Sequence, residues 1–591
     1  MMKRALTKQN LRSILRECGI SSSSRALSYT SIRKPNQPCL TQNLRSALVR
    51  SSARCLSSGP VTSPADIRSR IPDVEIPDVS FAEFILGRCD EFKDNIAVSD
   101  YLTGRKYTYQ QIKDFARRVA SALHKRGYKK GDVITTSTLN LPEFPILVLA
   151  AASLGVIVSP ANHMYTAAEL SRMLEHNGAC AIFTIPQLLP LVKEAISDPN
   201  VSGRIKETFT FGHEEEGALF FHTLMEDDGK SFPENVDIDP KKDVLLMPYS
   251  SGTTGLPKGV MLSHHNIVAN IMQLRDLLRV SPDEKTIALL PFFHIYGLTA
   301  VQFGSLYNGA QLVTIPRFEP EMFLKAMHEE KITILHAVPP IVLFLAKHPM
   351  VANFDLSNVS YMVSGAAPLS ESLTMECQNR LGFPIFQGYG LTETSPVINI
   401  DCHPGYPGTI GLLVPNTKAK LVDVDTGEPV KVGELGEYCM DGPQKMLGYL
   451  NNQQATDEMI DKDGWLHTGD LGYMREDGMV VIEDRLKELI KYKGYQVPPA
   501  ELEGLLLTHP AVSDASVIGI PEEGVGELPR AYVVLKPDVT VTPEEISKFV
   551  EERVTPSKRL RGGVEFLAEI PKTPSGKILR RVLKAKALQA S

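Results

Sequence analysis

The sequence predicts an α/β protein with a large N-terminal domain of helix-covered, mostly parallel sheets, a β-rich subdomain, and a small mobile α+β C-terminal domain. Short β-rich runs alternate with helical patterns over much of the chain, which is typical of parallel sheets covered by helices. Between Gly405 and Gly448, glycines punctuate short strands as in antiparallel hairpins. With 591 residues, the chain is also too long for one ordinary hydrophobic core.

The alternation begins with a strong helix signal. Thr108 and Gln111 have the spacing of a capping box, apolar residues recur at helical spacing from Ile112 onward, and Gly127 predicts the helix end. The longest apolar stretch, Ile146 to Val158, is too short to span a bilayer and predicts a buried helix that leads into a strand. We expect further strands at residues 133–135, 181–183, 244–247, 286–290, 311–315 and 332–338.

The domain boundaries follow from the same patterns. We expect the large domain over residues 60–483 and the C-terminal domain over residues 484–591. In the latter, Thr542 followed by Pro543 predicts the start of a helix. The basic stretch from Leu579 to Leu588 predicts an exposed helix. A segment of about 105 residues has the usual size of a domain.

The first 59 residues differ in composition from the rest of the chain. They contain eleven Lys or Arg residues, many serines and a single acid, Glu17. This composition is typical of a transit peptide, so we expect residues 1–59 to be removed on import into the mitochondrial matrix. A disordered N-terminal tail is the alternative that composition leaves open.

Charge and cysteine content exclude other classes. The formal net charge of −6 argues against a general nucleic-acid binder, which needs a basic excess to displace phosphate counterions. The eight cysteines follow neither metal-binding nor disulfide spacings, and we assign them no function. Trp465 is the only tryptophan. We expect it to be a core anchor rather than a site residue, because tryptophan mainly contributes buried apolar area.

The run from Tyr249 to Gly259 concentrates phosphate-binding chemistry. Three glycines, four Ser or Thr hydroxyls and Lys258 fall within eleven residues, directly after an apolar strand-like run. Glycines let backbone amides approach an anion, hydroxyls donate hydrogen bonds, and the ammonium adds a positive charge. The run is not a Walker A loop, because Pro257 precedes the lysine. We therefore predict that a polyphosphate binds here.

Six further motifs follow along the chain: PFFHIYG at 291–297, SGAAP at 364–368, QGYGLTE at 387–393, GWLHTGD at 464–470, DRLKELIK at 484–491 and PKTPSGK at 571–577. At these residues the chain resembles the adenylate-forming superfamily of acyl- and aryl-CoA synthetases. It is most similar to the branch that contains 4-coumarate–CoA ligase and luciferase. The resemblance covers essentially all of residues 60–591.

The resemblance implies an ATP-dependent acid–CoA ligase that uses ATP, Mg²⁺ and coenzyme A. A carboxylic acid, fatty or aromatic, would react with ATP to give acyl-AMP and pyrophosphate, and the acyl group would then pass to CoA. A luciferase-like adenylating monooxygenase and a catalytically silent nucleotide-binding homologue are the alternatives. The first would be distinguished by oxygen consumption, the second by ATP binding without release of pyrophosphate.

The resemblance also implies the residues that carry the chemistry. Lys577 would be the catalytic lysine of adenylation, Thr392 would contact the α-phosphate, and Glu393 would ligate Mg²⁺. Mg²⁺ prefers carboxylate and phosphate oxygens, and a cation between the α-phosphate and the acyl oxygen would stabilise the transition state. His294 and Tyr296 would line the acyl pocket, with His294 as a gate.

The remaining implied residues hold the nucleotide and CoA. The β- and γ-phosphates of ATP are expected at Ser250, Ser251, Gly252, Thr253, Thr254 and Lys258, and the adenosine at Ala366, Gln387, Gly388, Tyr389, Asp470 and Arg485. Lys487 would be the hinge between the domains. Lys491, Lys493, Gly494 and Gln496 would line the second active arrangement, in which the small domain turns to admit CoA, and Arg317 would contact the CoA phosphates.

Overall fold

The computed structural model of the chain describes residues 63–250, 257–401, 406–486, 488–493, 495–522, 525–537, 539–573 and 578–590, with side chains except those of Tyr495, Gln496 and Ala590. Several predicted features lie outside these ranges. They are the transit segment 1–59, the loop residues Ser251, Gly252, Thr253 and Thr254, and Lys487, Gly494 and Lys577. None of the described helices has the length and apolar character needed to cross a membrane.

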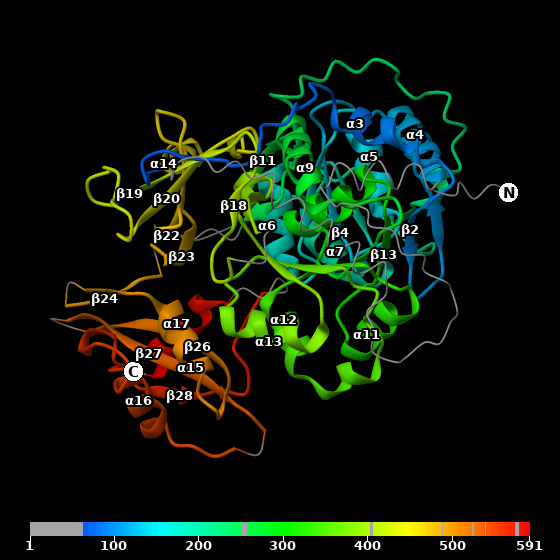
Figure 1. Ribbon diagram of the computed structural model, residues 1–591. Coiled ribbons are helices and arrows are strands. Elements are labelled where there is room, and N and C mark those ends of the chain that lie inside the picture. The colour runs from blue at the N-terminus through cyan, green and yellow to red at the C-terminus, as the bar shows by residue number, and fades with distance from the viewer. Residues whose placement is uncertain are drawn as a thin grey trace, which may run out of the picture. The chain divides into compact units, whose positions relative to one another are not determined.

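The predicted parallel sheets are present, with antiparallel strands added at their edges (Figure 1). The first is nine-stranded, with the order β10-β11-β9-β5-β4-β6-β7-β8 and β21 paired to β11. Its strands from β9 to β8 in this order are parallel, whereas β11 pairs antiparallel with β9, β10 and β21. The bounds are β4 Val133–Ser137, β5 Ile157–Ala161, β6 Ala181–Thr184, β7 Glu207–Thr210, β8 Leu219–Phe220, β9 Val244–Leu246, β10 Tyr249–Ser250, β11 Lys258–Ser263 and β21 Gly448–Tyr449.

The second nine-stranded sheet has the order β18-β17-β16-β15-β14-β12-β13-β2-β3. It is parallel from β16 to β2 and antiparallel at both ends. The bounds are β2 Ile96–Asp100, β3 Lys106–Thr108, β12 Lys285–Ala288, β13 Gln311–Thr314, β14 Ile334–Ala337, β15 Tyr361–Ser364, β16 Ile385–Gly390, β17 Val397–Ile400 and β18 Leu412–Leu413.

Helices of the large domain share one hydrophobic core with strands of both sheets. The capping box predicted at Thr108 is confirmed and starts α4, and the apolar stretch forms α5 and then β5. The α-helices are α3 Phe81–Cys89, α4 Tyr109–Lys125, α5 Phe144–Ser153, α6 Ala167–Asn177, α7 Leu189–Ile196, α8 His222–Met225, α9 His264–Leu278, α10 Gly304–Tyr307, α11 Pro320–Glu329, α12 Pro339–Lys347, α13 Glu371–Leu381 and α14 Gln453–Met459. Short helical turns are η2 Pro186–Leu188, the π-helix η3 Tyr296–Phe303, η4 Pro349–Asn353 and η5 Thr392–Thr394.

The β-rich subdomain is a five-stranded antiparallel sheet with its own apolar cluster. Its order is β1-β19-β20-β22-β23, with bounds β1 Ile67–Arg68, β19 Lys418–Val422, β20 Gly436–Asp441, β22 Leu466–Met474 and β23 Val480–Arg485. The expectation for Trp465 is wrong. Its ring is only partly buried, with the ammonium groups of Lys418 and Lys420 at 5.0 and 4.6 Å from its centroid, so it acts as a cation–π platform.

The C-terminal segment forms a separate α+β sheet with a core of its own. Its strands are β24 Ile490–Tyr492, β25 Tyr495–Val497, β26 Val512–Glu522, β27 Gly526–Leu535 and β28 Val564–Phe566. Its helices are α15 Pro499–Leu507, α16 Pro543–Glu551, the turn η6 Pro556–Lys558 and α17 Arg580–Ala590. The helix start predicted at Thr542 is confirmed by a capping box on α16.

A buried histidine joins two helices of the large domain. His264, the first residue of α9, is fully buried, and its Nδ1 accepts a hydrogen bond from the backbone N–H of Phe81, the first residue of α3, at 3.1 Å. This bond satisfies one of the donors that a helix start leaves unpaired. Burial lowers the pKa of His264 to about 4, so the side chain is neutral near pH 7.

We expect His264→Asn to make the stability less sensitive to acid, because its amide oxygen can still accept the Phe81 bond but does not titrate. The unfolded histidine binds protons from about pH 6.5 and the folded one only near pH 4, so the wild-type free energy of unfolding falls as the pH drops through this window. From pH 7 to pH 5, the wild type should lose about 2 kcal/mol more than the variant. Urea unfolding at both pH values measures this difference, and parallel losses would contradict it.

Candidate active site

The predicted phosphate loop is flanked by two paired strands. Ser250, at the end of β10, lies directly opposite Lys258, at the start of β11, in an antiparallel pair. The ammonium of Lys258 lies 4.8 Å from the ring centroid of Tyr449 on β21, which also pairs with β11. The residues that flank the glycine- and hydroxyl-rich run are therefore held together by backbone pairing, while the run itself, 251–256, lies outside the described residues.

A buried carboxylate lies beside this loop. Glu393 in η5 is 5% exposed, and its Oε1 accepts hydrogen bonds from the hydroxyls of Ser250, at 2.9 Å, and Tyr449, at 2.8 Å. None of the described residues donates a hydrogen bond to Oε2. A carboxylate with one oxygen held by two hydroxyls and the other available fits a magnesium ion that takes its remaining ligands from phosphate and water.

The turn before Glu393 is sterically constrained. A Cβ atom on Gly390 would lie 1.8 Å from the carbonyl oxygen of Pro396, so only glycine fits there. The hydroxyl of Thr394 donates to that carbonyl at 2.6 Å and accepts from the N–H of Leu391 at 3.0 Å. These contacts fix the backbone that presents the half-buried Thr392 and the buried Glu393.

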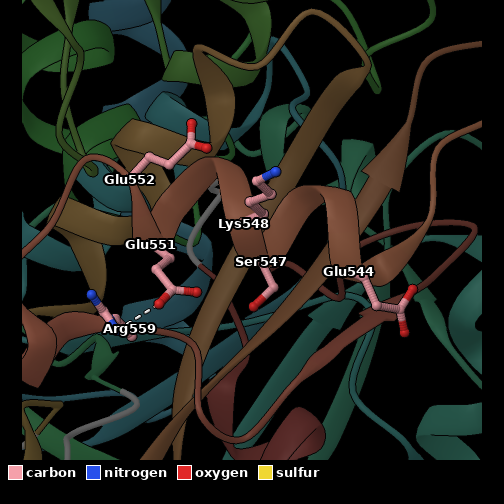
Figure 2. A pocket seen from close by; sticks show the side chains of 6 residues that line it. All are labelled: Glu544, Ser547, Lys548, Glu551, Glu552 and Arg559. Carbon is pink, nitrogen blue, oxygen red and sulfur yellow. Dashed lines mark ion pairs between the residues drawn. The ribbon is translucent and has the colours of Figure 1, made fainter.

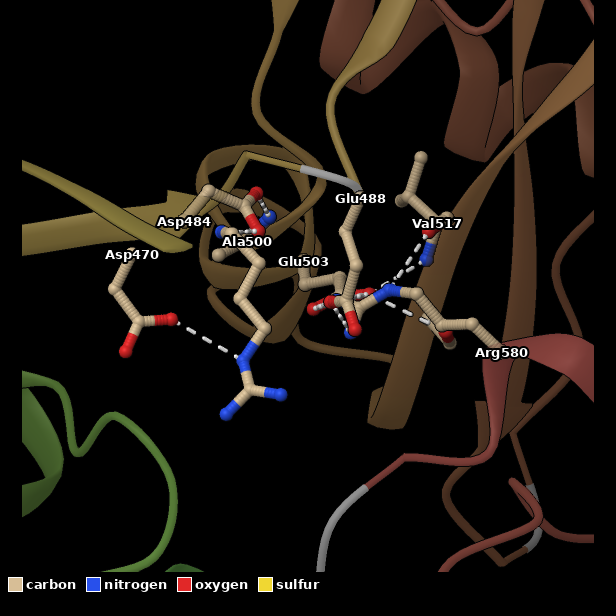
Figure 3. Close-up of polar contacts among 9 residues, drawn as sticks. Asp470, Asp484, Glu488, Ala500, Glu503, Val517 and Arg580 are labelled. Carbon is tan, nitrogen blue, oxygen red and sulfur yellow. Dashed lines mark hydrogen bonds and ion pairs between the residues drawn. The ribbon is translucent and has the colours of Figure 1, made fainter. Parts of the chain in front are cut away.

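A second cluster contains three of the predicted adenosine residues. Asp470 on β22 pairs in register with Arg485 on β23, and the Arg485 Nε lies 3.2 Å from Asp470 Oδ1. Figure 3 shows this ion pair extending from Asp470. The hydroxyl of Tyr389 donates to Asp470 Oδ2 at 2.7 Å, and burial with the nearby carboxylate raises the pKa of Tyr389 well above its usual range. Asp470 is thus oriented as a hydrogen-bond acceptor, which suits ribose hydroxyls.

The wall next to Tyr389 contains a strained residue. Ala366 adopts a left-handed backbone with φ of 72°, which costs a non-glycine residue about 1–3 kcal/mol. Gln387 on β16 pairs with Ser364 on β15, and its side-chain oxygen accepts from the N–H of Leu369 at 3.3 Å. Gln387 therefore ties β16, where Gly388 and Tyr389 follow, to the turn that carries Ala366.

The residues predicted for the acyl pocket follow a segment that an asparagine from the other sheet holds. Asn140, buried between β4 and α5, donates to the carbonyl oxygens of Ala288 and Leu290 at 2.8 and 2.9 Å and accepts from the N–H of Phe292 at 2.9 Å. These bonds fix the backbone just before His294. The His294 side chain is half-buried, and its Nδ1 accepts a hydrogen bond from the N–H of Tyr296 at 3.3 Å.

Tyr296, two residues after His294, forms a buried polar contact. Its hydroxyl lies 3.2 Å from His336 Nδ1 and donates to the carbonyl oxygen of Val363, also at 3.2 Å. A Cβ on Gly365 would meet the Tyr296 ring at 3.0 Å, so glycine lets the ring lie against β15 and the turn that follows it. Burial lowers the pKa of His336 to about 4, and the imidazole is neutral near pH 7.

The described residues on either side of Lys577 are also paired with each other. Lys572 and Ile578 form an antiparallel bridge on either side of residues 574–577, which lie outside the described residues. Lys572 pairs with Asp514 at 2.6 Å. On the other side, the Arg580 guanidinium binds Glu488 at 2.5 Å and both carboxylate oxygens of Glu503 at 2.8 Å (Figure 3).

The residues predicted for CoA and for the second arrangement lie on other elements. Arg317 is exposed between β13 and α11. Lys491 is exposed on β24, where its N–H donates to Glu527 at 3.0 Å and its backbone pairs with that of Gln496. Lys493 is exposed with a left-handed backbone, φ 48°. Their proposed roles stay predictions.

A surface pocket of about 550 Å³ lies elsewhere, on the outer side of α16. Figure 2 shows its charged lining and the ion pair between Arg559 and Glu551, at 2.5 Å. It is lined by Glu544, Ser547, Lys548, Glu551, Glu552 and Arg559. None of the predicted site residues lines it, so the chemistry is not assigned there.

Three residues that position the site were not found from the sequence: Tyr449, Asn140 and His336. Each acts on a partner 40 or more positions away along the chain. Tyr449 and Asn140 lie in ordinary strand-end and loop sequence, without a local pattern that marks them. His336 offered a weak signal, a lone histidine within an apolar strand run.

Comparison with known proteins shows the family of this chain. The AMP-binding enzyme family matches residues 87–450, and the AMP-binding enzyme C-terminal domain matches residues 501–577. "Probable 4-coumarate--CoA ligase 1" of Dictyostelium discoideum is 40% identical over 533 residues, which cover 87% of this chain and 97% of that protein. "4-coumarate--CoA ligase 3" of Arabidopsis thaliana is 39% identical over 537 residues, covering 89% and 94% of the two chains.

A solved structure shares the fold as well. The anthranilate CoA ligase AuaEII in complex with anthranoyl-AMP has a TM-score of 0.80 and 26% sequence identity, covering 88% of this chain and 98% of that one. Fold and relatives define the class, an AMP-forming acid–CoA ligase that works through an acyl adenylate. The chain belongs to the AMP-binding enzyme family. These findings give no support to a luciferase-like monooxygenase or to a catalytically silent homologue.

We expect Glu393→Gln to lower kcat/KM for MgATP by ~10²–10³, because the amide keeps the side-chain shape but loses the charge that a metal ion needs. Tyr449→Phe should cost only about 5- to 10-fold, since it removes one hydrogen bond to that carboxylate and leaves the ring under Lys258. Initial rates over a range of Mg²⁺ concentrations measure both effects. Equal losses in the two variants, or an unchanged Mg²⁺ requirement in Glu393→Gln, would contradict this assignment.

Proposed function

We propose that this acid–CoA ligase activates a monocarboxylic acid with an uncharged aromatic or aliphatic tail. The observation that carries the proposal is the absence of charge around Tyr296, which we predict for the acyl pocket: its hydroxyl contacts the His336 imidazole, which is neutral near pH 7, and its ring lies against Gly365. A second charge on the acid would lose its hydration there without gaining a partner among these three residues. The relatives named for 4-coumarate, an aromatic acid, support this substrate class.

In the first half-reaction, a carboxylate oxygen of the acid bonds to the α-phosphorus of ATP and pyrophosphate leaves. We assign Ser250, Lys258 and the loop between them to the leaving pyrophosphate, and Asp470 with Tyr389 to the adenosine. Thr392 and Lys577 would stabilise the charge that builds up at the α-phosphate. In the second half-reaction, the CoA sulfur bonds to the acyl carbon, AMP leaves, and the thiol proton passes to solvent.

The residues near the phosphates also fit a metal ion. Glu393, with Oε1 fixed by Ser250 and Tyr449, would hold Mg²⁺ through Oε2. When bound, the ion would neutralise charge on the phosphate oxygens. The protein's own contribution is to keep the Glu393 carboxylate buried and held in one orientation. The carboxylate then does not need to reorganise as negative charge develops on the phosphate oxygens.

A panel of acids tests the substrate class. With CoA and MgATP present, AMP release should be fastest with cinnamate-like or aliphatic monoacids. The kcat/KM for a diacid of the same length should be lower by about 10²-fold.

Lys577→Ala is the control for the mechanism. The rate of its acid-dependent pyrophosphate exchange should fall by ~10²–10³, yet it should still form thioester from supplied acyl-AMP. A preferred diacid would overturn the substrate class, and parallel loss of both half-reactions would overturn the role of Lys577.

We also propose that the enzyme works in the mitochondrial matrix. The support is the composition of residues 1–59, which contain eleven basic residues and one acid. Residues 1–59 fused to a fluorescent protein should enter mitochondria and be cleaved, whereas residues 60–591 fused to the same protein should not enter. A cytosolic, uncleaved fusion of residues 1–59 would contradict the proposal and would leave the ligase assignment untouched.

A further inference from the structure

A thiol, an imidazole and a carboxylate converge in the β-rich subdomain, on the strands β20 and β22. Cys439 on β20 lies directly opposite His467 on β22, and Glu437 lies two residues before Cys439 on the same strand. Cys439 is fully buried and Glu437 is 9% exposed. We call Glu437, Cys439 and His467 the β20–β22 cluster.

The cluster has the dimensions of a metal site. Its potential ligand atoms all lie within 4.8 Å of one another. His467 Nδ1 is 2.7 Å from Glu437 Oε2 and 3.5 Å from Cys439 Sγ. A tetrahedral zinc ion, with bonds of 2.0–2.3 Å, holds its ligand atoms about 3.3–3.8 Å apart. Side-chain adjustments of less than about 1 Å would therefore bring all three atoms onto one ion.

Two outer contacts fit the same arrangement. The other ring nitrogen of His467, Nε2, lies 3.4 Å from Asp461 Oδ2, and Asp461 is itself held by the N–H of Trp465 at 2.8 Å. A histidine that binds a metal usually donates its second N–H to such a carboxylate. Glu437 uses Oε1 to accept from the N–H of Gly469 at 3.0 Å, so Oε2 can bind an ion without breaking that bond.

We propose that the β20–β22 cluster binds a divalent cation that prefers sulfur ligands, such as Zn²⁺. Sulfur and imidazole ligands favour zinc over magnesium, which prefers oxygen. The His467 side chain is 29% exposed, so water can reach the fourth position. The cluster is distinct from Glu393, and the proposal does not depend on which acid the enzyme activates.

Binding must compete with protons. Burial raises the pKa of the Cys439 thiol, and contacts with Cys439 and then Glu437 raise the pKa of His467. When the cation binds, the Cys439 sulfur and the His467 Nδ1 become ligands, and the protons that they carried are released to solvent. The charged groups that face these two are Glu437, Asp461 and the more distant Lys420. Affinity should therefore increase with pH.

Cobalt spectroscopy tests the site. The full chain, purified without a histidine tag and without nucleotide, is titrated with Co²⁺ at pH 8. A sulfur-to-cobalt charge-transfer band in the near ultraviolet, lost when Zn²⁺ is added, is the expected result. Cys439→Ser should abolish this band, and Asp461→Asn should weaken binding by ~10- to 100-fold through loss of the outer carboxylate. Cys180→Ser, at a half-buried thiol next to β6, is the matched control and should keep the band.

Each outcome of these experiments either supports or overturns the proposed metal site. Absence of the band in the wild type, or its persistence in Cys439→Ser, would overturn it. Thermal unfolding of each variant without metal shows whether it is folded. If Cys439→Ser does not fold, the cobalt titrations of the wild type and of Asp461→Asn decide whether the site exists. Added Zn²⁺ should raise the wild-type Tm, more at pH 8 than at pH 6.5, and an equal rise in folded Cys439→Ser would also count against the site.

Discussion

The candidate site depends on one buried carboxylate at which three separate segments meet. Glu393 comes from the turn after β16, and its Oε1 is bound by Ser250 at the end of β10 and by Tyr449 on β21. A buried carboxylate is costly unless hydrogen bonds replace its water. Each donor therefore stabilises the fold and the site together. The same constraint links the stem of the phosphate loop to the turn that presents Thr392.

The two segments predicted to bind phosphate and to supply Lys577 are flanked in a similar way. Ser250 pairs with Lys258 on either side of the first segment, and Lys572 pairs with Ile578 on either side of the second. Ion pairs of Lys572 and Arg580 fix the flanks of the second segment further. Pairing of the flanking residues fixes where each segment begins and ends, so those positions need no further ordering when a ligand binds.

Sequence patterns predicted the elements whose causes are local. The helix starts at Thr108 and Thr542 and the buried helix before Val158 depend on neighbours within a few residues, and all are confirmed. Contacts set by the tertiary fold were not predicted. Trp465 is a partly exposed platform for two lysines of β19, because the register of the antiparallel sheet brings those lysines to its ring. Tyr449 and His336 likewise meet partners that only the fold brings near.

Asn140 has a consequence for changing the enzyme's substrate range. It comes from the loop after β4 in one sheet and binds the backbone at the end of β12 in the other, just before His294, the predicted gate. Its hydrogen bonds to described residues all go to backbone groups, so they do not depend on which side chains are present nearby. Protein engineers could therefore vary the predicted pocket residues in a library while these bonds keep the backbone before His294 in place, provided that position 140 stays asparagine.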